Sequence, residues 1–119
     1  MLPEIEEIFD EDDLYRRFTD KYLDDNGNLS SAAFQNTTGT DDMSVDLARL
    51  TTPERTALDN EIYGVAMIKA GFARNNNQIV IHSPSVDNNA HSTVRGKKTR
   101  GIKKKLAESA YIILRPIIH

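Results

Sequence analysis

Apolar and polar residues alternate over several short stretches of this 119-residue chain, and the pattern predicts β-strands. In the run DLYRRF, Leu14, Arg16 and Phe18 fall on one face of a strand, and Tyr15 and Arg17 fall on the other. Similar alternation, or a cluster of β-branched residues, marks the later strands. They are predicted over 29–34, 43–50, 63–69, 78–82, 91–95 and 111–115.

Apolar residues at helical spacing predict short helices between and before these strands. Leu2, Ile5 and Ile8 share one side of an amphipathic N-terminal helix whose outer face is acidic. A Thr-Pro-Glu sequence is typical of a helix start. Ile102 and Leu106, four positions apart, anchor a lysine-rich helix near the C-terminus. The predicted helices span 3–12, 53–60 and 97–110.

This succession of elements predicts one α+β domain over residues 1–119. We expect a mixed or mainly antiparallel sheet with two or three short helices. Within the domain, 1–13 is an acidic helical segment, 14–115 is the core and 116–119 is a tail.

Composition narrows the functional classes. The chain has no cysteine, which excludes disulfides and thiolate metal sites, and we expect neither a metal nor a cofactor. The turn at Gly27 is not a calcium loop, because Tyr22 would take the first ligand position. No apolar run approaches the roughly 20 residues of a membrane span, and the acidic start lacks the basic region of a signal peptide. We therefore expect a cytoplasmic protein without membrane association.

Charge is unevenly distributed, although the net charge is only −3. Residues 1–13 carry seven acids and no bases, whereas 95–105 carry seven bases and no acids. The leading expectation is a non-enzymatic binding module that presents this basic strand, turn and helix to a phosphate-rich or acidic partner. The candidate ligand-binding residues are Arg95, Lys97, Lys98, Arg100, Lys103, Lys104 and Lys105.

The partner of the basic stretch is expected to be a polyanion or an acidic protein surface. Contact with nucleic acid would be independent of base sequence, because no aromatic residue lies between Phe72 and Tyr111 to stack on bases. The acidic segment 1–13 is an alternative partner within the chain. Self-association is a further possibility, because Ile117 and Ile118 form an apolar tail.

The alternative to a binding module is a small enzyme that acts on a nucleotide or a phosphodiester. His91, Thr93 and Arg95 share one strand face, and they combine a proton carrier, a hydroxyl and a fixed cation. His-x-Thr is one half of the motif of two-histidine phosphoesterases. The second half would begin at His82, but Pro84 stands in the hydroxyl position. Neither a phosphate-binding P-loop nor a Gly-x-Ser-x-Gly elbow is present.

Arg16 is the third candidate catalytic residue, beside His91 and Thr93. Its strand face is shared with Leu14 and Phe18, so its guanidinium is partly inward and must be paired if it is buried. The two roles considered are a structural ion pair with Asp46 and a ligand contact in a pocket.

Two resemblances add to this interpretation. The series LYRRF, LSSAAF, MSVDLARL, GVAMIKAGFAR and AHSTVRGKK, over most of 14–105, resembles a widespread set of small uncharacterised bacterial proteins. That resemblance implies one compact domain and carries no activity. A Tyr-Arg strand followed by a serine-containing strand is also similar to NAD-using ADP-ribosyltransferase-like folds. This similarity implies that Arg16 lies on the first strand and Ser30 or Ser31 on the next, with an acid later in the chain.

Overall fold

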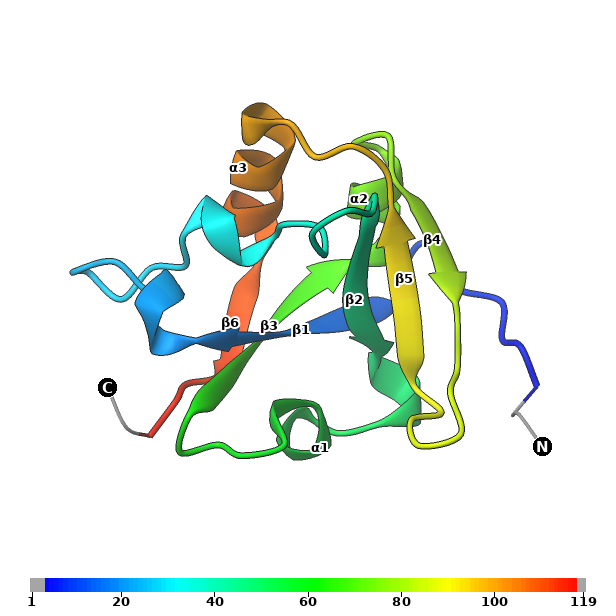
Figure 1. Ribbon diagram of the computed structural model, residues 1–119, viewed down its shortest axis with the longest axis horizontal. Helices are drawn as coiled ribbons and strands as arrows, with labels where there is room; N and C mark the ends of the chain where they lie inside the picture. The colour runs from blue at the N-terminus through cyan, green and yellow to red at the C-terminus, as the bar shows by residue number, and fades with distance from the viewer. Residues whose placement is uncertain (1–3, 118–119) are drawn as a thin grey trace.

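Six antiparallel strands form a single sheet in the computed structural model, which describes residues 4–117 (Figure 1). Their order across the sheet is β4-β5-β2-β1-β3-β6. The mainly antiparallel α+β architecture expected from the sequence is therefore confirmed. The strands are β1 (Asp13–Thr19), β2 (Asp42–Leu47), β3 (Tyr63–Lys69), β4 (Ile79–His82), β5 (His91–Arg95) and β6 (Tyr111–Leu114).

Short helices connect the strands. The α-helices described are α1 (Pro53–Ala57), α2 (Ala70–Arg74) and α3 (Arg100–Ser109). Both α1 and α3 begin at a threonine whose hydroxyl accepts a hydrogen bond from a first-turn amide, as an N-cap residue should. Single 3-10 turns occur at η1 (Asp20–Tyr22), η2 (Ser31–Ala33) and η3 (Ala48–Leu50).

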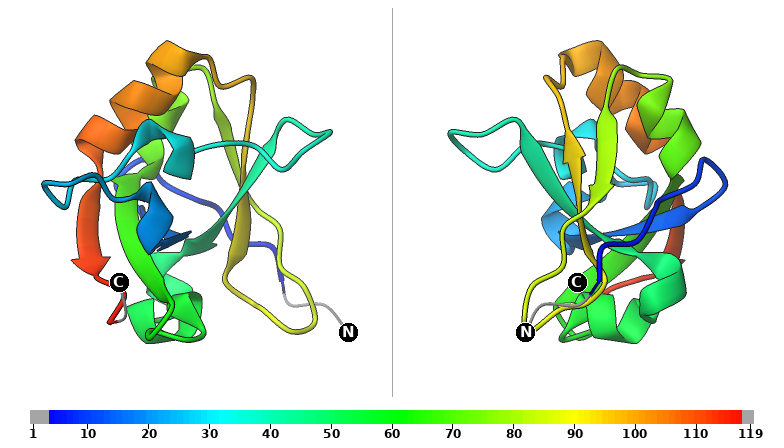
Figure 2. Two further views of the ribbon diagram at one scale, coloured as in Figure 1. Left: turned by 60° about the vertical axis from the view of Figure 1, so that its left-hand side comes forward. Right: turned by 90° about the vertical axis from the view of Figure 1, so that its right-hand side faces the viewer.

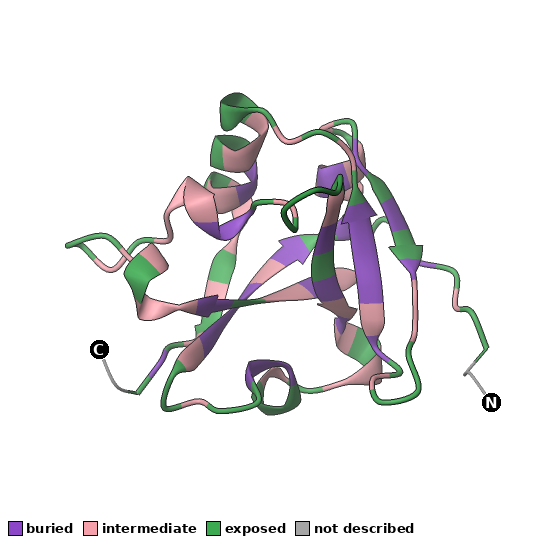
Figure 3. Ribbon diagram, in the orientation of Figure 1, coloured by how far each residue is buried: buried purple, intermediate pink, exposed green. Residues whose placement is uncertain are grey.

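The hydrophobic core lies between one face of the sheet and the elements η2, α2 and α3. Alternate residues of the central strands point into it, and Leu14, Met43 and Leu47 are fully buried there. Figure 3 shows these buried positions as purple bands along the strands, and the two views in Figure 2 show α3 standing against the sheet. Leu106 anchors α3 in the core, while the lysines around it lie outside. The opposite sheet face is covered only in part, by α1 packed on β1 and β3.

Strands β1 and β2 pair over a short distance and then diverge. Their ladder consists of Leu14 opposite Leu47 and Tyr15 opposite Asp46, whereas β1 pairs with β3 along its full length. Beyond this junction the side chain of Arg16 lies between the strands. The divergence leaves backbone carbonyls without a neighbouring strand, and the Arg16 guanidinium replaces that neighbour.

The helix expected over 3–12 is absent from the described residues, which begin at residue 4. Residues 4–12 form an irregular segment that lies along the body of the domain. Ile8 is buried, but Ile5 and Phe9 remain exposed, so the segment has no continuous apolar stripe against the core. Its acids are close enough in sequence to repel one another within a helix, and in the structure they bind basic side chains of other elements.

Residues 29–34 do not form the predicted strand. The hydroxyl of Ser30 accepts a hydrogen bond from the amide of Ala32 and begins the 3-10 turn η2. Serine side chains compete in this way with strand ladders. The helix predicted over 53–60 ends earlier, at Ala57, because Leu58 takes a positive φ of 65°. The strand over 63–69, followed by a short helix, and the strand over 91–95 are confirmed.

Candidate functional site

Polar side chains of β2 and β5 gather on the sheet face opposite the core. Ser44 lies opposite Thr93, and Asp46 lies opposite His91. Because alternate residues of a strand point to opposite faces, these side chains all point away from buried Met43. Here, therefore, residues far apart in sequence form one polar surface.

A cavity of about 500 Å³ opens over this surface. Its walls come from α1 and from the loop between β4 and β5, which lie at the same end of the sheet in Figure 1. The cavity contains both strand arginines and one arginine from α1. The lining residues with the relevant chemistry are Arg16, Arg17, Ser44, Asp46, Arg55 and His91. The structure thus brings His91 and Arg16, two candidates identified from the sequence, into one cavity.

His91 is held from both sides of its imidazole ring. Nε2 lies 3.2 Å from the hydroxyl oxygen of Ser44. Nδ1 lies 2.8 Å from the carbonyl oxygen of Ser83 and 3.0 Å from its hydroxyl oxygen. Thr93 is buried and does not line the cavity; its hydroxyl oxygen lies 2.8 Å from that of Ser83. The ring is therefore fixed, with one edge directed at Ser44.

Arg16 is bonded to backbone carbonyls. Nε donates to Ala33 O at 3.0 Å, Nη1 to Ser44 O at 2.8 Å and Nη2 to Gln35 O at 3.3 Å. Burial lowers the pKa of Arg16 from its usual value, and the neighbouring Arg17 lowers it further. These bonds use three of the five N–H donors of the guanidinium, so Arg16 is held by the backbone at the edge of the cavity.

The ion pair considered between Arg16 and Asp46 is not formed, and that prediction was wrong. Asp46 accepts hydrogen bonds from Thr56 Oγ1 at 2.7 Å and from Asn88 Nδ2 at 2.9 Å. The register explains the difference, because Tyr15 is the residue opposite Asp46. Arg16 therefore points to the other side of the sheet, away from Asp46.

The two other arginines of the cavity are more accessible. Arg17 and Arg55 are both exposed, and neither takes part in an ion pair within the described residues 4–117. The guanidinium of Arg17 lies 4.8 Å from the centre of the Tyr63 ring. These two guanidinium groups are positive charges that an anionic ligand can reach, and two carboxylates, Asp46 and Asp87, line the same cavity.

His82 does not join His91. In the register of β4 and β5 it lies opposite Ser92, so it occupies the core face of the sheet. It is buried, and its ring contacts the amide of Glu6 at 2.7 Å and the carbonyl of Asn89 at 2.6 Å. Residues 4–117 therefore contain no pair of facing histidines of the kind that a two-histidine phosphoesterase uses.

The basic stretch separates into members that are bonded to other residues of the chain and members that form no ion pair. Arg95 pairs with Asp42 at 2.7 Å, and Lys98 donates to the side chain of Asn36 and to the carbonyls of Val94 and Gly96. Burial, with a contribution from the charge of Arg16, lowers the pKa of Lys98 to about 8. The remaining five bases form no ion pair among the described residues: Lys97, Arg100, Lys103, Lys104 and Lys105.

The acidic N-terminal segment binds other bases. Arg49 pairs with Glu6 and Asp12, Arg74 pairs with Asp10, and Lys69 pairs with Asp13. Within residues 4–117, no ion pair joins this segment to the basic stretch 95–105.

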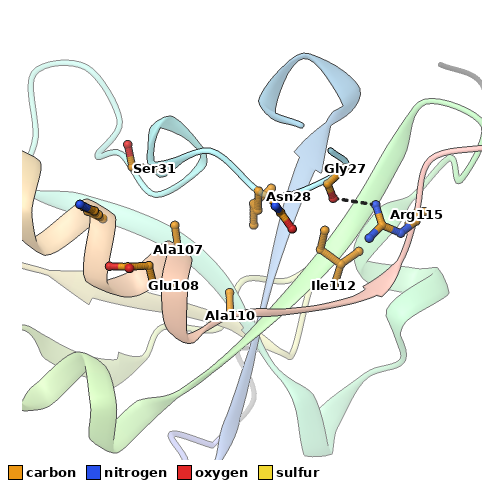
Figure 4. A pocket seen from close by; sticks show the side chains of 10 residues that line it. Gly27, Asn28, Ser31, Ala107, Glu108, Ala110, Ile112 and Arg115 are labelled. Carbon is orange, nitrogen blue, oxygen red and sulfur yellow. Dashed lines mark hydrogen bonds between the residues drawn. The ribbon is translucent and has the colours of Figure 1, made fainter. Parts of the chain in front are cut away.

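A second cavity, of about 620 Å³, lies between α3, β6 and the 27–31 turn (Figure 4). Arg115 crosses its mouth and donates to the carbonyl of Gly27 at 3.0 Å, shown as the dashed line in Figure 4. Lys104 is the member of the basic stretch that lines it. The basic helix therefore does not converge on the cavity of His91. Ile117 of the predicted apolar tail is exposed, and Ile118 lies outside the described residues.

Sequence reasoning missed Ser44 and Arg55 as members of the site. Alternation alone places Ser44 on the outward face of its strand, but pairing it with His91 requires the register between β2 and β5. Predicting Arg55 as a member of the site requires knowledge of how α1 packs on the sheet. Among residues 4–117, no group of three or more His, Asp or Glu side chains could hold a metal ion.

No helix in the described part of the chain has the length and apolar character needed to cross a membrane. Comparison with known proteins does not assign the chain to a family. No family model, no curated protein and no solved structure matches the chain significantly.

Proposed function

We propose that this chain is a small enzyme that acts on a nucleotide or a phosphodiester in the cavity of His91. The single observation that carries the proposal is the His91–Ser44 contact of 3.2 Å inside a cavity that three arginines also line. A histidine near a hydroxyl can transfer a proton during attack on a phosphorus or glycosidic centre. Cations beside that pair can bind the phosphate oxygens and stabilise the developing negative charge.

Each polar group has a distinct role in this proposal. His91 Nε2 takes a proton from a water that the Ser44 hydroxyl positions, while the water oxygen forms a bond to the phosphorus or the glycosidic carbon. The bond from that atom to the leaving group breaks, and His91 returns the proton to the leaving oxygen or to solvent. Arg17 and Arg55 bind phosphate oxygens, for which the planar guanidinium is well suited. Asp46 has capacity for further hydrogen bonds beyond its contacts with Thr56 and Asn88, so it can accept one from a sugar hydroxyl.

The resemblance to ADP-ribosyltransferase-like folds supports NAD as one substrate to test. It implies an arginine on the first strand and a serine on the next. Arg16 occupies the first place on β1. Ser30 and Ser31, the serines named by the resemblance, lie at a 3-10 turn and not on a strand, so this part of the resemblance does not fit. A different serine, Ser44 of β2, lies on a strand beside Arg16, and its carbonyl accepts a bond from Arg16. Asp46 supplies a carboxylate in the same cavity.

The test uses the whole chain with NAD, ATP and bis(p-nitrophenyl) phosphate, and measures products by chromatography and phosphorus NMR. His91→Gln is expected to lower the turnover rate by at least about 100-fold, because general acid–base catalysis contributes that much. Lys104→Gln, in the other cavity, is the matched control and should leave the rate unchanged. Equal rates for His91→Gln and the unaltered chain would overturn the proposal, as would the absence of both turnover and binding with all three compounds.

A second candidate function rests on the basic stretch, and one observation favours it. Its five bases that form no described ion pair leave positive charge accessible along α3 and the preceding turn, which suits an external polyanion or acidic surface. Binding to duplex DNA or heparin should weaken steeply as salt rises. Changing these five residues together to Gln should abolish that binding, whereas Lys21→Gln should not. Undiminished affinity of the fivefold variant would exclude this function.

A further inference from the structure

The segment His82-Ser83-Pro84 contributes to the site in a way that the proposed function does not include. Ser83 follows β4 and extends its ladder, because its amide donates to the carbonyl of His91 at 3.0 Å. This backbone bond places Ser83 beside the imidazole of His91, where both its carbonyl and its hydroxyl oxygen contact Nδ1.

The carbonyl contact determines which ring nitrogen of His91 carries the proton. A carbonyl oxygen only accepts hydrogen bonds, so Nδ1, 2.8 Å away, must be the donor. In a neutral imidazole the other nitrogen is then an acceptor. Nε2 therefore directs its lone pair at Ser44, as a general base needs.

Two neighbours hold Ser83 in this orientation. Pro84 restricts the residue before it to an extended backbone, which fixes the direction of the Ser83 carbonyl. Buried Thr93 lies 2.8 Å from the Ser83 hydroxyl. Since Nδ1–H donates toward Ser83, the Ser83 hydroxyl is free to donate to Thr93. The chain of contacts runs from Thr93 through Ser83 to His91.

We propose that Ser83 is a positioning residue that sets the tautomer and orientation of His91. Its place in catalysis rests on the proposed function, but the tautomer does not. His82 provides an internal reference for the NMR signals of His91, because its two ring nitrogens have the opposite hydrogen-bonding roles. The amide of Glu6 donates to His82 Nδ1, so the proton of His82 lies on Nε2, which donates to Asn89.

The experiment is long-range proton–nitrogen NMR of the ¹⁵N-labelled whole chain at a pH where the rings are neutral. His91→Gln and His82→Gln variants assign the signals. His91 is expected in the Nδ1–H form and His82 in the Nε2–H form. Ser83→Ala keeps the carbonyl and should leave the Nδ1–H form dominant. Pro84→Gly releases the extended backbone that directs this carbonyl, and it should convert the His91 signals to those of a mixture of the two tautomers. Ser44→Ala, on the other side of the ring, should leave the Nδ1–H form dominant.

Activity measurements distinguish the positioning role of Ser83 from the proposed enzymatic function. If the unaltered chain is active, Pro84→Gly should lower kcat by about tenfold with little change in KM, since it alters the base and not the phosphate contacts. An Nε2–H tautomer for His91, or a Pro84→Gly spectrum identical to that of the unaltered chain, would overturn the positioning role. An inactive chain that shows the expected tautomers would overturn the proposed enzyme and leave the role of Ser83 intact.

Discussion

Replacing Arg16 with Ala is expected to lower the free energy of unfolding by about 3 kcal/mol. The substitution leaves the carbonyls of Ala33, Gln35 and Ser44 without their donor. Leaving a buried acceptor unpaired typically costs about 1–3 kcal/mol, and water can reach the more exposed carbonyls and reduce the total. Removing a buried charge offsets part of the loss, as the lowered pKa of Arg16 indicates. Chemical denaturation at constant pH measures the difference.

The adjacent arginine provides the matched control. Arg17 lies on the opposite face of β1, is exposed and contacts the Tyr63 ring, so Arg17→Ala should cost less than about 1 kcal/mol. Arg16→Met removes the N–H donors but keeps an unbranched apolar side chain, so it tests the contribution of the hydrogen bonds alone. A stability of Arg16→Met close to that of the unaltered chain would show that the three hydrogen bonds do not support the diverging strands.

Gly64→Ala should be destabilising to a similar extent, by about 3 kcal/mol. A Cβ at this position would lie 2.6 Å from the carbonyl oxygen of Leu114 and 2.6 Å from the ring of Phe18, with Pro116 at 2.8 Å. Leu114 O belongs to the backbone of the neighbouring strand, so the sheet itself must move to accept a methyl group. Glycine is required here for close approach rather than for a special backbone angle. Thermal unfolding reports the loss.

Gly101→Ala is the control for the same chemical change, and it should have the opposite sign. A Cβ there meets only Thr99 Oγ1, at 3.9 Å, and Gly101 lies in the first turn of α3. Alanine is favoured over glycine in helices by about 1 kcal/mol, so this variant should unfold at a higher temperature. Destabilisation by Gly101→Ala, or tolerance of Gly64→Ala, would contradict the packing described at these two positions.

The alternation of side chains was sufficient to predict most of the sheet and the outward direction of His91. It was not sufficient to predict which strands are neighbours, and the site depends on that. Ser44 and His91 meet because β2 pairs with β5, and no local pattern encodes this register. The missing register also led to the wrong pairing of Arg16 with Asp46. Alternation shows which residues of one strand share a face, but it does not show which residues of a neighbouring strand lie on that same face.

The two elements that were predicted wrongly, the N-terminal helix and the strand over 29–34, are explained by contacts with residues distant in sequence. The N-terminal apolar residues have helical spacing, but a short acidic helix gains little without a continuous buried stripe, and Arg49 and Arg74 offer its acids better partners. In 29–34, apolar residues suggested a strand. The carbonyls of Ala33 and Gln35 instead accept from Arg16, so side-chain donors replace a ladder. In both segments, long-range contacts override the local preference.

The strand order also has a consequence for how the protein is made. Of the six strands described, β1 is synthesised first and lies inside the sheet, and its two partners β2 and β3 are the next to be synthesised. The later strands β5 and β6 add outside them, and β4 is completed as soon as β5 exists. The sheet can therefore assemble outward from β1 in the order in which its strands are synthesised, and the exposed hydrogen-bonding edges of the growing sheet are covered as each later strand docks.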